Sequence, residues 1–289
     1  MRKVELEQGS PEWLAWRKSV VTATDAPILM GASPYATPYK GWQRKVGLAE
    51  EQPFNSAMGR GQRDEPVARQ MFIDEYGIDM HPAVIESTLN PFCGASLDGI
   101  SECGRYLLEI KSNGDHYHNN LSKGIPDFHQ MQIQHQLLCT DSAAEMCFYF
   151  SYNNGSRICK EIYPDKAWLE EYLEKAKKYW ENIVFFEPPA MTLKDYRDMN
   201  GIAEWKAAAD NYQSLCSEIK KLDEMKEYYK RELTRLSGEE SCMGSGVKVI
   251  KKVTKGRVDY ESIPELLGVN LEQYRKPASS CWMVTVDRK

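Results

Sequence analysis

Two short apolar segments in the middle of the chain limit the fold most strongly. Phe92–Ile100 and Arg105–Ser112 are short, apolar-rich and separated by a turn-forming stretch that contains glycine, which predicts a β-hairpin. Each segment also carries charge, with Asp98 in the first and Glu109 and Lys111 in the second. Side chains two residues apart in a strand share a face. The second segment therefore points its acid and its lysine to the same side.

The expected pairing of the hairpin brings the two acids together. If Ile100 pairs with Arg105, Asp98 falls opposite Leu107 and lies diagonal to Glu109 on the same face. Two carboxylates and a carbonyl suit Mg²⁺, which keeps waters and takes phosphate oxygens. Such an ion acidifies a water and neutralises charge on a scissile phosphate. A slip of one residue would separate the acids.

Lys111 would orient or deprotonate that water, or steady the phosphate. The alternative is a solvent-exposed strand with a Glu-x-Lys charge pair, because short patterns of this kind often arise by chance.

A third acid and two amides extend the pattern. Glu65 lies in a predicted helix from Gln62 to Tyr76, on the stripe that carries the helix's apolar residues. A bound ion or Lys111 would explain a charge there, and so would a half-exposed position near the positive end of the helix dipole. Gln132 and Gln134 lie in a predicted helix over residues 127–138, where amides suit contacts with water and phosphate or simply form an exposed face.

Arg17 and Thr24 form a second candidate group. A helix that begins near Thr24 would present free N–H groups to an anion, and an arginine beside it would grip a terminal phosphate through two hydrogen bonds. The alternative for Arg17 is a surface position in which its side chain packs on Trp13.

The rest of the chain is predicted to alternate helices with strands. We expect helices over residues 10–17, 24–31, 37–42 and 165–186, and a strand pair over 145–152 and 157–162. The Pro188–Pro189 pair marks a domain boundary between a core of residues 1–189 and an extension of 190–289. In the extension, residues 201–236 are predicted to form a long helix with coiled-coil-like spacing. A loop is expected over 238–246 and a basic β-ribbon over 247–260, which either contacts DNA or is a strand edge guarded by lysines.

Composition excludes several classes of protein. The eight cysteines form no C-x-x-C pair, which argues against a zinc ribbon or an iron–sulfur centre. No apolar run is long enough to cross a bilayer, and the first residues lack the apolar segment of a secretion signal, so we expect a cytoplasmic protein. The net charge of −5 gives no overall signature of nucleic-acid binding, although an enzyme acting on DNA can place basic groups locally.

Taken together, these segments resemble the phage lambda exonuclease (YqaJ-type) family. The resemblance covers roughly residues 8–187 and rests on six segments in the family's order: Trp13–Arg17, Val21–Thr24, Arg60–Glu65, Ser96–Gly99, Leu108–Lys111 and Gln132–Gln134. It implies an α/β (α+β) fold of the PD-(D/E)XK nuclease type, with a central mixed sheet flanked by helices.

The resemblance also implies an activity. Family members digest linear duplex DNA processively from 5′ to 3′ with Mg²⁺, for which Mn²⁺ is a substitute, and leave 3′ overhangs for single-strand annealing. They are phage or prophage proteins that form ring oligomers and work with an annealing protein.

The family's site residues carry over onto matching positions of this chain. The implied metal ligands are Asp98, Glu109 and the Ile110 carbonyl. Lys111, Glu65 and Gln132 would surround the attacking water and the scissile phosphate. The implied 5′-phosphate site consists of Arg17, Thr24 and Ser96.

The chain departs from the family at two places. His129 stands where lambda exonuclease has a tyrosine, so it receives no role, and residues from about 191 onward extend beyond the lambda-sized core. Two rival functions stay open: an endonuclease of the same fold, such as a restriction or resolving enzyme, and a non-catalytic DNA-binding recombination adaptor that acts through its long helix and ribbon.

Overall fold

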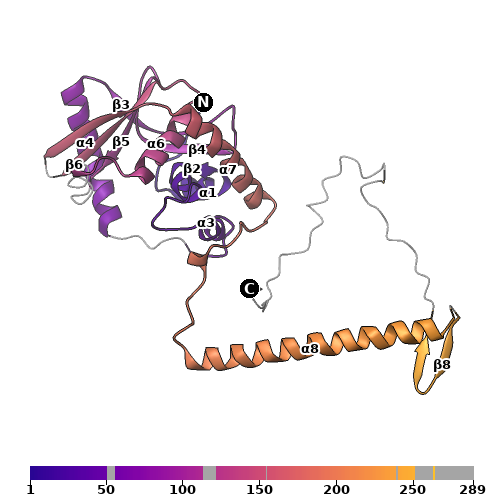
Figure 1. Ribbon diagram of the computed structural model, residues 1–289. Helices are drawn as coiled ribbons and strands as arrows, with labels where there is room; N and C mark the ends of the chain where they lie inside the picture. Colours follow the sequence, from indigo (N-terminus) through magenta and orange to yellow (C-terminus); the bar gives the residue numbers. More distant parts are fainter. Residues whose placement is uncertain (51–55, 113–121, 154, 239, 251–262, 264–289) are drawn as a thin grey trace. The chain divides into compact units, whose positions relative to one another are not determined.

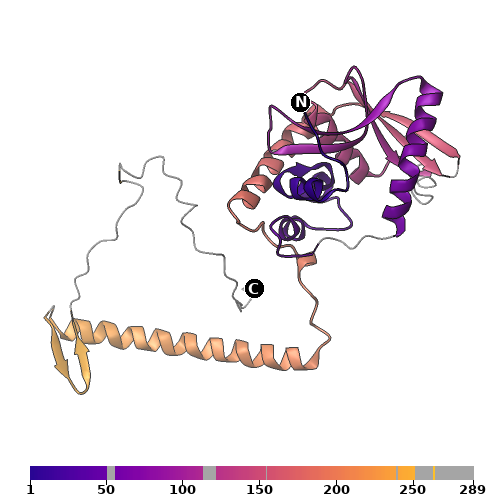
Figure 2. The ribbon, with the colours of Figure 1, turned by 180° about the vertical axis from the view of Figure 1, so that it is seen from behind.

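The computed structural model describes residues 1–50, 56–112, 122–153, 155–238, 240–250 and 263. It divides into two compact units, Met1–Arg197 and Asp198–Lys289, which are described separately (Figures 1 and 2). The first unit continues eight residues past Pro189, because the short 3₁₀ helix η2 (Leu193–Asp195) docks on the beginning of α3. There Thr37 donates a hydrogen bond to Asp195, and Lys40 Nζ lies 3.0 Å from the Lys194 carbonyl oxygen.

A mixed seven-stranded sheet forms the centre of the first unit. Its strands follow the spatial order β1-β3-β4-β5-β6-β7, and β2 pairs with β4. Pairing is antiparallel except between β2 and β4 and between β5 and β6. The strands are β1 (Arg2–Val4), β2 (Val21–Thr22), β3 (Met80–Glu86), β4 (Cys93–Ser101), β5 (Tyr106–Lys111), β6 (Met146–Asn153) and β7 (Ser156–Ile162).

Helices lie on both faces of this sheet (Figure 1). The 3₁₀ turn η1 (Ala23–Asp25) leads into the short α2. Two helices begin at an N-cap followed by proline, Ser10 before α1 and Thr37 before α3, as the Ser-Pro and Thr-Pro pairs predict. The helices are α1 (Pro11–Ser19), α2 (Ala26–Leu29), α3 (Pro38–Lys45), α4 (Ser56–Tyr76), α6 (Asp127–Cys139) and α7 (Lys166–Val184).

The alternation of side chains along β5 assigns each helix to a face. Leu108 and Ile110 pack with Ala68 and Phe72 of α4. Leu107 points the other way and packs with Ile133 and Leu137 of α6. The sheet is therefore the middle layer between α4 and α6. Helix α7 adds a further cluster in which Tyr172 and Tyr179 meet α2 and Trp42 of α3.

The pairing of the central hairpin corrects one prediction. Ile100 pairs with Leu107, not with Arg105, and Gly99 pairs with Leu108. The turn is longer than expected, because Tyr106 N donates to Ser101 Oγ at 3.0 Å and keeps Arg105 in the turn. Asp98 is therefore not opposite Leu107. The register is shifted by two residues, and an even shift leaves each side chain on its predicted face.

The helix expected from Thr24 also begins differently. Thr22 caps the η1 turn, and the Asp25 carboxylate accepts hydrogen bonds from both the backbone N–H and the hydroxyl of Thr22. Thr24 lies inside this turn and is exposed. The turn therefore has its N-cap at Thr22, two residues before the helix start predicted at Thr24.

The second unit consists of one long helix and a small hairpin. Helix α8 (Ala203–Leu236) is followed by β8 (Cys242–Gly244) and β9 (Val247–Val249), which pair antiparallel. Ser245 and Gly246 both have positive φ, at 49° and 79°, as a tight two-residue hairpin turn requires. The prediction of a loop over 238–246 is therefore wrong for Cys242–Gly244, which form strand β8 of this hairpin. Most of the predicted ribbon, residues 251–260, lies outside the described residues.

Within the described ranges, no helix is both long and apolar enough to span a membrane.

Candidate active site

Glu109 is the most deeply buried charge of the predicted cluster. It is 2% exposed and lies on β5, facing α6. Its Oε1 accepts a hydrogen bond from Gln132 Nε2 at 2.9 Å, and its Oε2 accepts one from Gln136 Nε2 at 2.6 Å. The Lys111 ammonium forms an ion pair with Oε1 and lies 3.5 Å from Gln132 Oε1. The structure therefore brings Glu109, Lys111 and Gln132 together, as the sequence predicted.

Asp98 lies where β4 and β5 separate. Between β3 and β4 the partners step from His81 with Ile100 to Ala83 with Leu97, so β4 has one extra residue there. This β-bulge contains Asp98 and Gly99, and bulges re-aim side chains next to sites. The Asp98 carboxylate accepts the backbone N–H of Ile110 at 2.7 Å. The Asp98 side chain thus accepts the Ile110 N–H, which would bond to a backbone carbonyl of β4 if the regular strand pairing continued.

The glycine after Asp98 has a steric reason. A Cβ at Gly99 would lie 3.0 Å from the Cβ atoms of both Leu108 and Met80, closer than ordinary packing allows. Glycine lets the bulge sit tightly against β5 and β3, which holds Asp98 near the β5 backbone.

Glu65 reaches the same cluster from α4. It forms an ion pair with Arg69 one turn along the helix, and Arg69 Nε donates to the Asp98 carbonyl oxygen at 2.6 Å. Arg69 therefore ties α4 to the bulge. Arg69 is not among the site residues predicted from the sequence, although its spacing of four from Glu65 places both on one helix face.

The charges of the cluster act on one another. Burial, together with the charges of Glu109 and Glu65, raises the pKa of Asp98 well above its usual range, against the opposing effect of Lys111. The pKa of Glu65 is also raised, first by burial and then by Glu109, while Arg69 opposes the shift. Burial would lower the pKa of Lys111, but the Glu109 and Asp98 carboxylates outweigh it and raise that pKa.

The donor atoms fit a hard divalent cation with few protein ligands. Three carboxyl groups interact in one place, and burial together with their mutual repulsion raises the pKa of Asp98 and of Glu65, which a bound cation would oppose. In the part of the chain that the structure describes, no three His, Cys, Asp or Glu side chains form a ready metal cluster. Mg²⁺ suits this setting because it keeps several waters and commonly takes one or two carboxylates. Asp98, Glu109 and the Ile110 carbonyl are the groups that would hold it.

Replacing Asp98 with asparagine should separate metal binding from stability. A carboxyl whose pKa is raised by folding destabilises the folded state as the pH rises from the usual carboxyl range toward that raised pKa. Without metal, Asp98→Asn should therefore unfold at a higher temperature than wild type at pH 8, and at a similar temperature at acidic pH. Each kcal/mol is worth about 2–4 °C in a domain of this size.

Added Mg²⁺ should reverse this order, because it should stabilise the wild type and not the variant. Thermal unfolding followed by circular dichroism, with Mg²⁺ and with EDTA, measures both effects. Asp74→Asn on the exposed side of α4 is the control. A wild type that gains nothing from Mg²⁺ or Mn²⁺ would contradict the metal assignment.

Two further residues of α6 have structural partners. Gln134 points away from Glu109, and its amide bonds to the Tyr163 carbonyl oxygen and the Asp165 N–H, each at 2.8 Å. His129 is buried, with Nδ1 2.9 Å from the Tyr149 hydroxyl. Gln136, which the sequence analysis did not single out, is instead the second amide on Glu109. Its position four residues after Gln132 was the available signal, since residues i and i+4 share a helix face.

The predicted phosphate residues also lie together. Arg17 Nη2 donates to Thr24 Oγ1 at 3.0 Å, and the Arg17 guanidinium lies 4.5 Å from the centre of the Trp13 ring. Trp13 Nε1 in turn donates to Ser96 Oγ at 2.7 Å. Arg17 packs on Trp13, as the alternative interpretation predicts, and it also contacts Thr24; its binding of a phosphate stays a prediction. Ser96 connects this group to Asp98, two residues further along β4.

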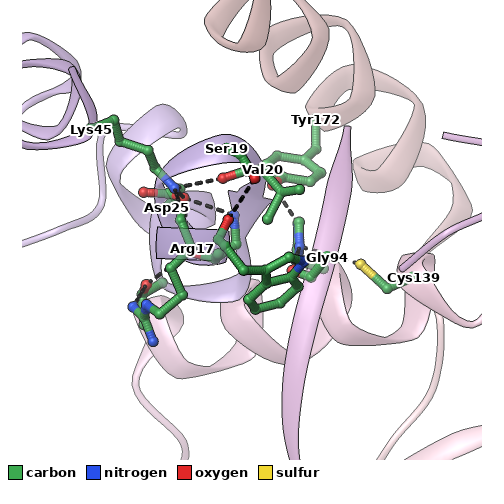
Figure 3. Close-up of polar contacts among 12 residues, drawn as sticks. Arg17, Ser19, Val20, Asp25, Lys45, Gly94, Cys139 and Tyr172 are labelled. Atoms are coloured by element: carbon green, nitrogen blue, oxygen red, sulfur yellow. Dashed lines mark hydrogen bonds and ion pairs between the residues drawn. The ribbon is translucent and has the colours of Figure 1, made fainter. Parts of the chain in front are cut away.

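A buried ion pair fixes the backbone beneath Arg17 (Figure 3). Lys45 Nζ lies 2.6 Å from Asp25 Oδ2 and donates to the carbonyl oxygens of Arg17 and Val20 at 2.8 and 2.6 Å. Both side chains of the pair are less than a tenth exposed. Although burial opposes it, Lys45 lowers the pKa of Asp25. Asp25 also caps the turn that holds Thr24, so this pair positions Arg17 and Thr24 together.

Lys45→Met should destabilise this group, because Lys45 is the buried counter-ion of Asp25. Methionine keeps the length of the side chain but leaves Asp25 buried without its cation, which costs about 3–5 kcal/mol when a buried pair is broken. Because the pKa of Asp25 is lowered in the folded state, this loss should be present at neutral pH and disappear as the pH falls below the usual aspartate range.

Urea unfolding at pH 7 and at acidic pH measures the effect of Lys45→Met. The double variant Asp25→Asn/Lys45→Met should recover part of the stability. Equal losses in the single and double variants would show that the pair itself is not the cause.

His135 of α6 belongs to the core. Its Nε2 lies 3.0 Å from the Gly94 carbonyl oxygen and its Nδ1 lies 2.6 Å from the Tyr172 hydroxyl, with Cys139 Sγ beside it (Figure 3). Burial lowers the pKa of His135 to about 4. A neutral imidazole with both nitrogens engaged is a structural element, although His, Cys and Tyr together resemble a catalytic group.

The sheet with helices on both faces and the acids at the parting of β4 and β5 define a PD-(D/E)XK nuclease fold. The structure of the alkaline exonuclease LHK-Exo from Laribacter hongkongensis is similar, with a TM-score of 0.54, 25% sequence identity and coverage of 62% of this chain and 94% of that one. The structure of LHK-Exo in complex with dAMP matches equally well.

The sequence is also similar to those of known proteins. Residues 12–143 match the YqaJ-like viral recombinase domain. The uncharacterized protein YqaJ of Bacillus subtilis (strain 168) is 23% identical over 188 residues, or 62% of this chain. The chain spans 57% of the length of that relative. The matched residues contain Arg17, Thr24, Glu65, Asp98, Glu109, Lys111 and Gln132.

Proposed function

We propose that this chain is a Mg²⁺-dependent exonuclease that digests one strand of linear duplex DNA from its 5′ end and leaves a 3′ overhang for recombination by single-strand annealing. The observation that carries the proposal is the connection between two groups of residues. The Asp98–Glu109–Lys111 cluster has the charges needed for phosphodiester hydrolysis. Through Ser96 and Trp13 it is joined to an arginine and a threonine suited to a terminal phosphate.

Each side chain has a part that follows from its contacts. Glu109 is held rigidly by Gln132 and Gln136, and Asp98 is fixed by the Ile110 N–H. Lys111 is kept protonated by these acids, so it would orient the attacking water or steady the phosphate as a cation. Glu65, whose pKa is raised by burial and by Glu109, would accept a proton or a hydrogen bond from that water. When bound, Mg²⁺ would acidify that water and neutralise charge growing on the phosphate.

The polarity and the partners of the enzyme belong to the same proposal. LHK-Exo is an alkaline exonuclease whose structure has been determined with dAMP, which supports a nucleotide-binding site in this fold. Linear duplex DNA is the proposed substrate, Mn²⁺ the substitute ion, and a single-strand annealing protein the proposed partner. A ring of several copies around the DNA would hold the enzyme on its substrate.

Digestion of linear and circular duplexes tests the proposal directly. With Mg²⁺, a label at the 5′ end of a strand of linear duplex should be released before a label at its 3′ end. Closed circular duplex should stay intact, and EDTA should stop the reaction on linear duplex. Cutting of the circle would favour the related endonuclease. DNA binding without any hydrolysis in Mg²⁺ or Mn²⁺ would favour a non-catalytic adaptor.

The enzyme should prefer a 5′-phosphorylated end, and Arg17 should be the reason. A terminal phosphate monoester carries more charge than an internal diester, so a fixed guanidinium distinguishes them. Losing this contact in Arg17→Ala should cost about 1.5–3 kcal/mol, or on the order of tenfold to a hundredfold of the advantage of a phosphorylated end.

Initial rates on 5′-phosphate and 5′-hydroxyl duplexes measure this preference. Lys18→Ala, which removes a neighbouring positive charge from α1, is the matched control and should keep it. If Arg17→Ala also keeps the full preference, Arg17 only packs on Trp13 and the phosphate binds elsewhere.

A further inference from the structure

Helix α8 carries an apolar stripe that has no cover within the described part of the chain. None of its 34 residues is buried, yet large apolar side chains recur along it. Ile219 is 57% exposed and Leu222 is 64% exposed. An exposed stripe of this length marks an interaction surface.

The stripe follows a heptad repeat over the whole helix. Its apolar positions are spaced alternately three and four residues apart, which corresponds to the a and d positions of a heptad. The a positions are Trp205, Tyr212, Ile219, Lys226 and Leu233, and the d positions are Ala208, Leu215, Leu222, Tyr229 and Leu236. The helix spans almost five heptads, more than the roughly three to four that indicate a coiled coil. The opposite face is mostly polar, with residues such as Lys220, Glu224 and Arg231, as expected for a surface facing water.

We propose that α8 pairs with α8 of a second copy of this chain in an antiparallel two-stranded coiled coil, with Ile219 of each copy opposite Leu222 of the other. The inference does not depend on the proposed nuclease function. It follows from the sequence of the stripe, which is complementary to itself when reversed. In this register Trp205 faces Leu236 and the small Ala208 faces Leu233. Because the pair is two-fold symmetric, each of these contacts occurs twice.

Lys226 decides against the parallel arrangement. It is the single charged residue among the ten seam positions. In a parallel pair it would meet Lys226 of the other copy inside the apolar seam, where like charges repel. In the antiparallel register it faces Leu215, while its ammonium stays with Asp223 of its own helix at 2.5 Å. The aliphatic part of a lysine packs well on leucine with its charge at the edge.

The flanking charges favour the same orientation. In a parallel pair the g position Glu218 would lie beside the e position Asp223 of the other copy, and two acids there weaken the pair. In the antiparallel register Glu218 lies beside Met225, and Asp223 lies beside Cys216. No like-charged pair then remains along the seam flanks.

The particle mass of the full chain tests for self-pairing. Ile219→Glu/Leu222→Glu puts two acids into the seam, and Ser217→Glu/Lys220→Glu puts two on the outer face as the matched control. By mass photometry, the seam variant should have half the mass of wild type or less, and the control should match wild type. Circular dichroism should show that the first unit stays folded. Equal masses for all three proteins would overturn the proposal and leave another partner, or residues 251–289, as the occupant.

Disulfide formation tests the orientation. In a background with Cys103, Cys216, Cys242 and Cys281 changed to serine, Trp205→Cys and Leu236→Cys are made as two separate proteins. Oxidation of the mixture should give a disulfide-linked pair of one chain of each kind, and neither protein alone should form one. Linked pairs from each protein alone would show parallel helices, and no linked pair in the mixture would overturn the register.

Discussion

Glu109→Gln should abolish digestion of linear duplex, with a loss on the order of 10³-fold or more in kcat. The carboxylate is 2% exposed and accepts hydrogen bonds from Gln132, Gln136 and Lys111. All three partners donate to the Glu109 carboxylate, whereas a glutamine side chain has one oxygen acceptor and one NH₂ donor. Glutamine therefore cannot accept all three hydrogen bonds. It also removes a full negative charge from the proposed cation site, which no other residue of β5 replaces.

Single-turnover rates in saturating Mg²⁺ measure this effect, and DNA binding is measured separately. Glu145→Gln is the matched control, because Glu145 is an exposed acid paired with Arg105 in the turn before β5. The control should keep near wild-type rates. Should Glu109→Gln also keep them while remaining folded, the metal site has been placed wrongly and the acid only stabilises α6.

Lys111→Met should lose turnover far more than DNA affinity, by about 10²–10⁴-fold in kcat if the lysine acts on the attacking water or on the phosphate. Lys111 lies beside Glu109 and is about one-fifth exposed. A cation this enclosed makes little contact with a long DNA backbone. Its removal instead takes away the positive charge that interacts with Glu109 and Asp98. The same change should destabilise the fold, because Glu109 loses its counter-ion inside the protein.

Rates at saturating DNA, compared with the measured Kd, separate the two effects. Lys177→Met, at an exposed position of α7, is the control for loss of a lysine. A variant whose kcat is unchanged and whose Kd rises would contradict the role of Lys111 in chemistry. Added Mg²⁺ should restore some stability to Lys111→Met without restoring its rate, because the ion replaces the lost charge but not the position of the ammonium.

The central elements could be predicted because local spacing decides them. The alternation in Leu108–Lys111 assigns Glu109 and Lys111 to one face whatever the partner strand is, since side chains alternate with a period of two. This is why a pairing wrong by two residues still left these side chains on the correct face. The helix of Glu65 and the helix of Gln132 were likewise visible from their composition and periodicity.

The extra residue in β4 could not be predicted in the same way. The bulge at Asp98–Gly99 depends on how β3 and β5 pair with β4 on either side, and on the space left by Met80 and Leu108. These contacts join residues that are distant in sequence. The pairing expected for the hairpin placed Asp98 near Glu109, but it did not predict the hydrogen bond from Ile110 N–H that fixes Asp98.

By itself, the sequence determined which side chains share a face, where the long helices lie and which acids and lysine form the candidate site. Only the tertiary structure decided which neutral and basic groups hold them. Arg69 on Asp98, Gln136 on Glu109 and Lys45 on Asp25 are each brought to their partners by the packing of a helix against the sheet or against α1 and η1. Periodicity reports the direction of a side chain from its own element, whereas a hydrogen bond also needs the position of a second element, and burial of the whole core sets that position.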